Sequence, residues 1–468
     1  MTLALTRLLL TVLLPQGAPT AGDPIAYYQQ DGKTVPVTRG QVATEMAFHL
    51  RRKDSGRSAA EHLVASTLVR RAARNQGLWP TEAEVEVLRS TLEQQLRAQG
   101  RDLMQEPVVK NGGLAQLLED LATQIAHEKL VRKQLGMSDQ EAVGSEMLKL
   151  WLIEEKQRVA VIDDPEQLPL GTAVRIGGDD VAIDALGDLL LRISDQTDQD
   201  RFIRQVVALE RLEALGREWQ TEVSPEDIER EFEVRSAMAE RDPRYQGMSF
   251  EQLLQSQGIT LEWLRQSRVF RTQLLQKKLV AKMHPRAKML EEIEADRQAA
   301  LDRAGPRRRL GIIFVRALRE PNELIPRDFE AAKSHLETVR KRLDDEAFDY
   351  VARVESEDPR SKVQGGDLGW FQRVGQGLPD NVLASAFALE LGEVSEPLLG
   401  SDGAYLVKVL DAEPMPTDDE LIVRMREQLA QEMTRDLLAS ARITRLDGTP
   451  MDPRQAPAPN GESQKSGK

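Results

Sequence analysis

Three glycines within five residues, followed at once by two large aromatic side chains, constrain the fold of this chain more than any other feature. The stretch reads Gly365-Gly366-Asp367-Leu368-Gly369-Trp370-Phe371. Glycine adopts positive φ without strain, so the backbone here is expected to turn tightly. Asp367 is expected to cap that turn rather than act as a catalytic acid, and Trp370 and Phe371 are expected to form core and pocket wall.

Further motifs follow in a fixed order. The segment Ala386-Phe387-Ala388-Leu389 ends a short apolar helix, and Leu391-Gly392-Glu393-Val394-Ser395-Glu396-Pro397 forms a turn. The run Ala404-Tyr405-Leu406-Val407-Lys408-Val409 has the two-residue period of a strand. Together the loop, helix, turn and strand resemble the parvulin family of peptidyl-prolyl isomerases. The resemblance covers residues 307–410, about a fifth of the chain.

The resemblance implies a set of site residues. Parvulins rotate the peptide bond before proline, against a barrier of roughly 18–20 kcal/mol and without breaking a bond, so no cofactor is expected. Their site combines two histidines on the central strands with a cysteine or aspartate and an apolar proline pocket. Transfer of this pattern gives Asp358 and Tyr405 as catalytic candidates. The implied substrate-binding residues are Leu378, Val382, Phe387, Trp370 and Phe371.

The sequence departs from the family pattern at both histidines. The first falls on Gly311 in the opening strand, and the second falls on Tyr405. The pocket phenylalanine falls on Val382, or on Leu383 after a slip of one residue. Two interpretations remain open: an altered but working site in which the Tyr405 hydroxyl partners Asp358, or a parvulin fold kept for binding, with weak or absent catalysis.

Charge and composition exclude several other classes of function. The net charge of −13 argues against nucleic acid, whose phosphates require a basic surface. The chain has no cysteine, which excludes disulfides, thiolate catalysis and cysteine-ligated zinc. The five histidines are scattered without i, i+4 pairs, so no metal site is expected. No phosphate-binding or dinucleotide-binding glycine pattern points to a small-molecule cofactor.

Residues 1–22 have the order of a secretory signal peptide. Arg7 precedes a short apolar run, 8–14, and small residues follow through Gly22. The sequence therefore predicts export to the periplasm or another extracytoplasmic compartment. No later segment is long and apolar enough to span a bilayer, so an integral membrane protein is not expected.

The region ahead of the parvulin-like part is predicted to be an internal duplication, with helical units at 23–140 and 141–305. Each unit opens with short extended runs; in the second, Ala173–Gly177 is extended and a helical pattern begins at Val181. Three landmarks pair in order, at offsets of 139, 143 and 136: Val35 with Val174, Thr81 with Ser224, and Gln116 with Gln252. The second pair are hydroxyl N-caps with an acid three residues later.

The remaining segments complete an α+β, multi-domain prediction. A parvulin-like domain of four strands and surrounding helices is expected at 306–412, a docking helix at 413–446 and a disordered tail at 447–468. The docking helix carries one apolar stripe: Leu421, Met425, Leu429, Met433 and Leu437. The tail is rich in Pro, Gly, Ser and Gln.

This arrangement resembles exported foldases of the SurA and PpiD type. It implies a foldase that binds unfolded or proline-containing polypeptide clients. The alternative is a dedicated assembly or scaffold partner of a secretion or envelope complex that uses the parvulin fold only for binding.

Overall fold

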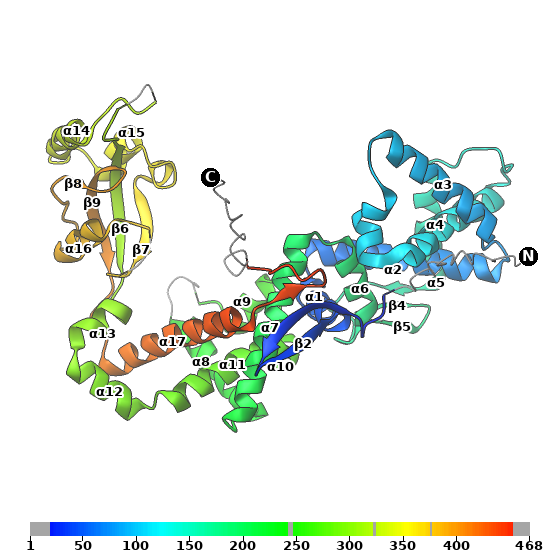
Figure 1. The fold of residues 1–468 in the computed structure, drawn as a ribbon, viewed down its shortest axis with the longest axis horizontal. Coiled ribbons are helices and arrows are strands. Elements are labelled where there is room, and N and C mark those ends of the chain that lie inside the picture. Colours follow the sequence, from blue (N-terminus) through cyan, green and yellow to red (C-terminus); the bar gives the residue numbers. More distant parts are fainter. Residues whose placement is uncertain (1–18, 242–246, 322–323, 375–376, 453–468) are drawn as a thin grey trace, which may run out of the picture. The chain divides into compact units, whose positions relative to one another are not determined.

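The computed structural model describes residues 19–241, 247–321, 324–374 and 377–452. Residues 1–18, which hold most of the predicted signal peptide, and residues 453–468 of the predicted tail lie outside the described part. The chain forms two compact units, Met1–Leu275 with Thr434–Lys468 and Gln276–Met433 (Figure 1). Helices and small antiparallel sheets together give the predicted α+β class.

The first unit is mainly helical. Its helices are α1 (Arg39–Leu50), α2 (Asp54–Asn75), α3 (Glu82–Ala98), α4 (Pro107–Leu135), α5 (Ser145–Val159), α6 (Ile183–Ile193), α7 (Gln196–Glu218), α8 (Pro225–Arg241), α9 (Phe250–Ser256), α10 (Leu261–Gln266) and a short 3₁₀ turn at Leu103–Gln105. Its strands are β1 (Pro24–Gln30), β2 (Lys33–Thr38), β3 (Val161–Ile162), β4 (Thr172–Ile176), β5 (Asp179–Ala182) and β10 (Thr444–Arg445). The unit boundaries fall inside α11 (Arg268–Met283) and α17 (Asp418–Ala441).

The first unit contains two antiparallel sheets of three strands with the same arrangement. Their strand orders are β10-β1-β2 and β3-β4-β5. In each, a tight hairpin leads directly into a helix. The predicted helical start at Val181 is wrong, because Val181 lies in β5 and the helix begins at Ile183. Gly177 and Gly178, with φ of 62° and 90°, close the hairpin that places Val181 in a strand. Val174 lies in β4, the central strand of its sheet. The equivalent strand of the other sheet is its central strand β1, not the edge strand β2 that holds Val35.

One buried core serves both predicted helical units. Met46 and Leu68 come from the first predicted unit, and Ile176, Leu190 and Phe202 from the second. Helices α1 and α6 approach so closely that a Cβ on Gly187 would lie 2.2 Å from the Ala43 carbonyl oxygen. The division into two domains at residue 140 stays a prediction.

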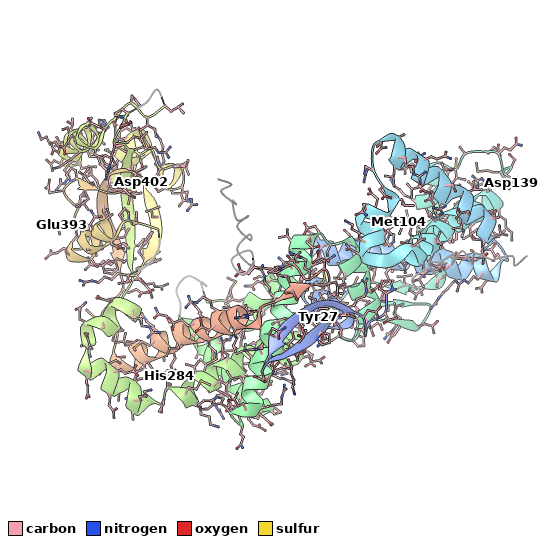
Figure 2. The ribbon with its side chains drawn as sticks, in the orientation of Figure 1. Tyr27, Met104, Asp139, His284, Glu393 and Asp402 are labelled. Carbon is pink, nitrogen blue, oxygen red and sulfur yellow. The ribbon has the colours of Figure 1, made fainter. Side chains whose placement is uncertain are left out.

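The end of α17 and the segment after it belong to the first unit. Leu438 and Ala441 pack on its core, and Thr444 of β10 pairs with Tyr27 of β1. Tyr27 is labelled in Figure 2. Residues 447–452 were expected in the tail, yet Met451 is buried and its carbonyl accepts a hydrogen bond from Arg204 of α7.

The second unit contains the predicted four-stranded sheet. Its strands are antiparallel and lie in the order β7-β6-β9-β8. Its strands are β6 (Arg308–Arg316), β7 (Asp367–Phe371), β8 (Leu398–Leu399) and β9 (Gly403–Ala412). Its helices are α12 (Arg286–Ala295), α13 (Arg297–Ala304), α14 (Phe329–Arg342), α15 (Phe348–Glu355), α16 (Asp380–Ala388) and a 3₁₀ turn at Lys362–Gln364.

Helices cover both faces of this sheet. On one face, Ile313 and Leu406 pack against α14 and α15. On the other, Phe314 and Tyr405 pack against α16. Beside the sheet, the start of α17 buries residues of its predicted stripe, Leu421 and Met425, against α12 and α13. Within the described residues, no helix combines the length and the apolar composition that crossing a membrane requires.

Candidate functional site

One sheet face of the second unit gathers most of the predicted site residues. On β6 and β9, Phe314 lies opposite Tyr405 and Ile312 lies opposite Val407. Side chains alternate between the faces of a sheet, so all four join one apolar cluster beneath α16. The face is therefore apolar wherever the two central strands meet.

The glycine loop supports this face from β7. Gly365, Gly366 and Gly369 have φ of 68°, 88° and 84°, which confirms the predicted positive φ. At Gly366 any Cβ would lie 2.7 Å from the Ile312 carbonyl oxygen, and the Ile312 N–H donates to the Gly366 carbonyl at 2.8 Å. Asp367 caps the turn as predicted, because its carboxylate accepts the Gly369 N–H at 2.8 Å.

The proline-pocket candidates separate into two groups. Leu378 and Val382 are buried in the cluster that contains Tyr405, and Phe371 and Phe387 pack against it. Trp370 lies outside that cluster with 41% of its surface exposed. The structure thus brings four candidates together with Tyr405 and leaves Trp370 apart. Their roles in substrate binding stay predictions.

Tyr405 makes its polar contact within its own hairpin. Its ring centroid lies 4.7 Å from that of Phe314, and its hydroxyl donates to Asp402 Oδ1 at 2.6 Å. Asp402 is labelled in Figure 2. Burial, followed by the hydrogen bond to Asp402, raises the pKa of Tyr405 above its ordinary value. The phenol is therefore neutral at physiological pH.

The Tyr405 hydroxyl donates to Asp402 and not to Asp358, the partner considered for an altered site, although, after burial and Asp402, the charge of Asp358 also contributes to the raised pKa of Tyr405. Asp358 Oδ2 instead accepts from the Ser361 N–H at 2.8 Å and from the Ser361 hydroxyl at 2.6 Å. Asp358 thereby fixes the loop that leads into the 3₁₀ turn. Asp402, three residues before Tyr405 in the same hairpin, is the acceptor for the phenol. A catalytic role of Asp358 stays a prediction.

The placement of the first family histidine at Gly311 does not agree with the strand geometry. A Cβ on Gly311 would lie 2.9 Å from the Phe348 ring of α15, on the face opposite Tyr405. A shift of one residue along a strand moves a side chain to the other face. The β6 residues on the face of Tyr405 are Leu310, Ile312 and Phe314, and none carries an imidazole.

Three residues of this site were missed from the sequence. Phe314 supplies the ring against Tyr405, and Asp402 holds the hydroxyl. Ser356 is fully buried, and its hydroxyl accepts the backbone N–H of Phe314 at 3.2 Å and of Asp358 at 3.4 Å. The position of Asp402 in the turn before the last strand was the only sequence signal for any of them.

Comparisons with known proteins agree with the location of this site. Residues 317–411 match the family described as rotamase, PPIC-type PPIase domain. Foldase protein PrsA 2 of Bacillus cereus is 34% identical over 106 residues, 22% of this chain and 36% of that protein. Chaperone SurA of Alkalilimnicola ehrlichii is 37% identical over 105 residues, 22% of this chain and 23% of that protein.

A solved structure of the peptidylprolyl isomerase PrsA from Bacillus anthracis aligns with 50% of this chain and 94% of its own. The identity is 19% and the TM-score 0.24. The sequence matches thus span from about a quarter to about a third of the two curated relatives.

Proposed function

We propose that this chain, whose residues 317–411 are a PPIC-type parvulin domain, is an exported foldase. Its clients are unfolded or proline-containing polypeptide segments. It holds them chiefly by binding, and its isomerase activity is weak or lost.

The observation that carries this proposal is the engagement of the polar groups around Tyr405. Isomerisation needs a preorganised group that favours the twisted amide over the planar one. The Tyr405 hydroxyl donates to Asp402, and Asp358 accepts from Ser361. Ile312 and Phe314 are buried beside Tyr405 and add no polar group. These two polar groups are thus already paired within the domain, which supports binding of clients over catalysis on the amide.

Exposed apolar side chains in the first unit supply a second binding surface. On α5, Met147, Leu150 and Ile153 are exposed by 38%, 58% and 53% at spacings of three residues. Residues three apart on a helix are neighbours, so these three form one stripe. Contiguous exposed apolar surface is typical of interaction sites. We assign this stripe, called the α5 stripe below, to the capture of apolar client segments.

Aggregation of a chemically denatured client, followed by light scattering, tests this assignment. Wild type is expected to suppress aggregation at near-stoichiometric amounts. A double variant, Leu150→Glu with Ile153→Glu, is expected to need about fivefold more protein, since loss of one of the few residues that dominate an interface costs about 1 kcal/mol or more.

Val87→Glu is the matched control, because Val87 is 68% exposed on α3 and lies outside the stripe. Circular dichroism checks that each variant is folded. Equal protection by wild type and the double variant would remove the α5 stripe from the proposal. No protection by wild type, with one tight folded partner in pull-downs, would favour the assembly-partner alternative.

Export is tested separately. We expect the mature chain in the extracytoplasmic fraction, with its N-terminus near residue 23 by mass spectrometry. An intact Met1 on protein retained in the cytoplasm would contradict export.

A further inference from the structure

Helix α5 is held on the first unit by few buried side chains. Two of its fifteen residues are buried, Trp151 and Glu155. Trp151 packs among apolar side chains of α2 and α4, and Leu148 and Leu152 lie partly buried at the edge of this cluster. Glu155 pairs with Arg158 of the same helix at 2.5 Å. The apolar attachment of α5 therefore depends chiefly on Trp151.

A cavity beside Trp151 weakens this attachment further. It has a volume of about 430 Å³ and lies between the C-terminal ends of α2, α4 and α5. Lys133 of α4 and Glu154 of α5 line it together with Leu130. Side chains that border a cavity lose packing contacts on that side. Less packing is therefore given up when α5 moves.

The backbone has a joint at each end of α5. Before the helix, Gly136 ends α4 with φ of 65°, and the connection 137–144 is irregular. After the helix, Ala160 has φ of 57°, a left-handed conformation that is strained for a residue with a Cβ. Hinge motions are absorbed by a few residues at the ends of elements. The helix can therefore swing about these two positions.

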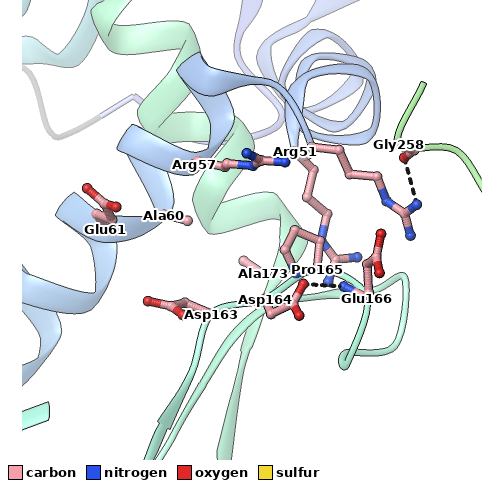
Figure 3. A pocket seen from close by; sticks show the side chains of 11 residues that line it. Arg51, Arg57, Ala60, Glu61, Asp163, Asp164, Pro165, Glu166, Ala173 and Gly258 are labelled. Atoms are coloured by element: carbon pink, nitrogen blue, oxygen red, sulfur yellow. Dashed lines mark hydrogen bonds between the residues drawn. The ribbon is translucent and has the colours of Figure 1, made fainter. Parts of the chain in front are cut away.

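The chain beyond the second joint is anchored. Strand β3 pairs with β4, and the loop 163–166 lies across a cavity of about 280 Å³ from Arg51 and Arg57 (Figure 3). Guanidiniums and carboxylates line this cavity together, and Asp164 also accepts the Glu166 N–H at 3.0 Å. Motion of α5 would therefore leave the neighbouring sheet in place.

A buried histidine lies beneath α5. The His127 ring of α4 meets Trp151 edge-on, with centroids 5.1 Å apart, and makes a hydrogen bond to the backbone of Leu148. Its Nε2 is buried and has no hydrogen-bond partner. A neutral imidazole tolerates this arrangement, because one nitrogen donates and the other carries no proton. An imidazolium would bury a second N–H without an acceptor, which is costly.

The charged side chains of the three packed helices do not offset that cost. They pair with one another: Arg70 and Arg74 of α2 with Glu119 of α4, Arg132 with Glu128 on α4, and Arg158 with Glu155 on α5. Among the described residues, no charged side chain contributes to the pKa of His127. Burial lowers this pKa to about 4, against a smaller opposite effect of the bond to Leu148.

Acid therefore favours the state in which α5 has moved away. There the imidazole reaches water, and its pKa returns toward the ordinary value of 6.5. The docked state thus binds fewer protons than the released one. The contribution of neutral His127 to docking is complete above pH 6.5 and is lost as the pH falls toward 4.

We propose that mild acid releases α5 from α2 and α4 and thereby exposes a second apolar surface for unfolded clients. This surface comprises Leu148, Trp151 and Leu152 on α5, with Leu130 and Val131 on α4. On α5 it lies opposite the α5 stripe. Acid also unfolds many polypeptides, so the surface opens when clients are most abundant. The inference rests on the proposed function for its client, but not for the movement of α5.

Hydrogen–deuterium exchange of the full chain tests the movement without a client. Rates at pH 5.5 and pH 7.5 are compared after correction for intrinsic exchange. Peptides covering residues 145–159 are expected to exchange at least about fivefold faster at pH 5.5, because the released state binds one more proton. Peptides covering residues 161–176, in the anchored sheet, are expected to keep their rate.

Two variants assign the response to one imidazole. His127→Gln is expected to remove it, since glutamine stays neutral and can still donate to the backbone of Leu148. His62→Gln is the matched control, because His62 is exposed, and it is expected to respond as wild type does. Should His127→Gln fail to fold, the wild-type profile still decides, since exchange of residues 145–159 that is independent of pH would overturn the proposal.

Binding of a permanently unfolded client tests the consequence. The probe is a carboxymethylated polypeptide with a pH-insensitive dye, followed by fluorescence anisotropy. Wild type is expected to gain at least about threefold in affinity at pH 5.5 relative to His127→Gln, because more of it is released. Faster exchange without this gain would overturn the client surface. Binding at both pH values with unchanged exchange would contradict this inference alone, whereas no binding at either would contradict the proposed function as well.

Discussion

Tyr405 lies at the strand position to which the sequence resemblance assigns a histidine, and its surroundings suit a phenol. Its ring packs against Phe314, and its hydroxyl reaches Asp402 in the adjoining turn. This partly buried hydrogen bond to a carboxylate can hold the hairpin between β8 and β9 in one register. We infer that Tyr405 stabilises the sheet more than it acts on a client.

Removing this hydroxyl is expected to loosen the β8–β9 hairpin. Tyr405→Phe loses one hydrogen bond of about 1 kcal/mol, which corresponds to about fivefold faster amide exchange. Hydrogen–deuterium exchange of peptides covering residues 398–412 measures this change. Tyr350→Phe is the control, because Tyr350 is 57% exposed. Exchange at the wild-type rate in Tyr405→Phe would contradict a stabilising role for the hydroxyl.

His127 gives the first unit a dependence on pH. It lies on α4 with its ring centroid 5.1 Å from that of Trp151, and its Nε2 is buried without a partner. Burial lowers the pKa of His127 to about 4, against 6.5 in a model compound. The unfolded chain therefore takes up the proton first. The contribution of neutral His127 is complete above pH 6.5 and is lost as the pH falls toward 4.

The expected loss between pH 7 and pH 4.5 is about 1–2 kcal/mol, after allowance for partial solvent screening. Urea unfolding followed by tryptophan fluorescence measures it, since four of the five tryptophans lie in the first unit. His127→Gln is expected to lose less stability over this range than wild type, while the exposed control His62→Gln follows wild type. Identical pH dependence in wild type and His127→Gln would contradict the account.

Single residues show what the sequence could and could not indicate. The positive φ angles of the glycines in the loop 365–369 were predictable, because they depend only on the conformational freedom of glycine itself. The hydrogen-bond partner of Tyr405 was not predictable, since the sequence offers both Asp358 and Asp402 and only the fold determines that Asp402 accepts the bond. The burial of Arg51 was not predictable, because the residues next to it in the sequence do not indicate that it is covered in the fold.

At the scale of elements, the crossing of α1 and α6 holds the first unit together. The backbones meet at Ala43 and Gly187. Arg39, at the start of α1, donates to Asp188 of α6 at 2.7 Å and to the Asn111 carbonyl of α4 at 2.6 Å. This crossing relates equivalent helices of the two predicted repeats, each of which follows a hairpin.

A methyl group at this crossing is expected to be damaging. Gly187→Ala would force the two helices apart, because the added Cβ would lie 2.2 Å from a backbone oxygen that cannot move alone. Overpacking of this kind costs about 1–3 kcal/mol. The midpoint of urea unfolding, followed by tryptophan fluorescence, is expected to fall accordingly.

Gly144→Ala is the control, since a Cβ on Gly144 meets nothing within 4 Å and its φ is −78°. An unchanged midpoint in Gly187→Ala would show that the helices do not approach as closely as described.

Whether a segment forms a helix or a strand was more predictable than which positions of the two repeats correspond. The helix starts at Thr81 and Ser224 follow from hydroxyl caps, and both are seen. The segment at Val181 was predicted to be helical, because the spacing of its apolar residues fits the period of a helix as well as that of a strand. The position of Gly311 failed for a related reason: sequence order does not state which face of a strand a residue occupies.

At the scale of the whole molecule, the parvulin-type domain accounts for about a fifth of the chain. The rest provides helical surface with exposed apolar side chains on α5 and an arginine-lined cavity. The class and the sheet of the smaller part were predictable because several motifs occur in order. The shared core of the larger part was not, because contacts between α1 and α6 join residues about 140 positions apart.

The most direct test of the account is the rate of proline isomerisation in a tetrapeptide substrate, measured on the same preparation that suppresses client aggregation. We predict a rate within about twofold of the uncatalysed one, because the Tyr405 hydroxyl and Asp358 are already paired within the domain and the described residues of the cluster around Tyr405 include no imidazole. Protection against aggregation is expected to persist in Asp358→Ala and Leu378→Ala. Strong acceleration by wild type, lost in both variants, would contradict the claim that this domain serves mainly to bind.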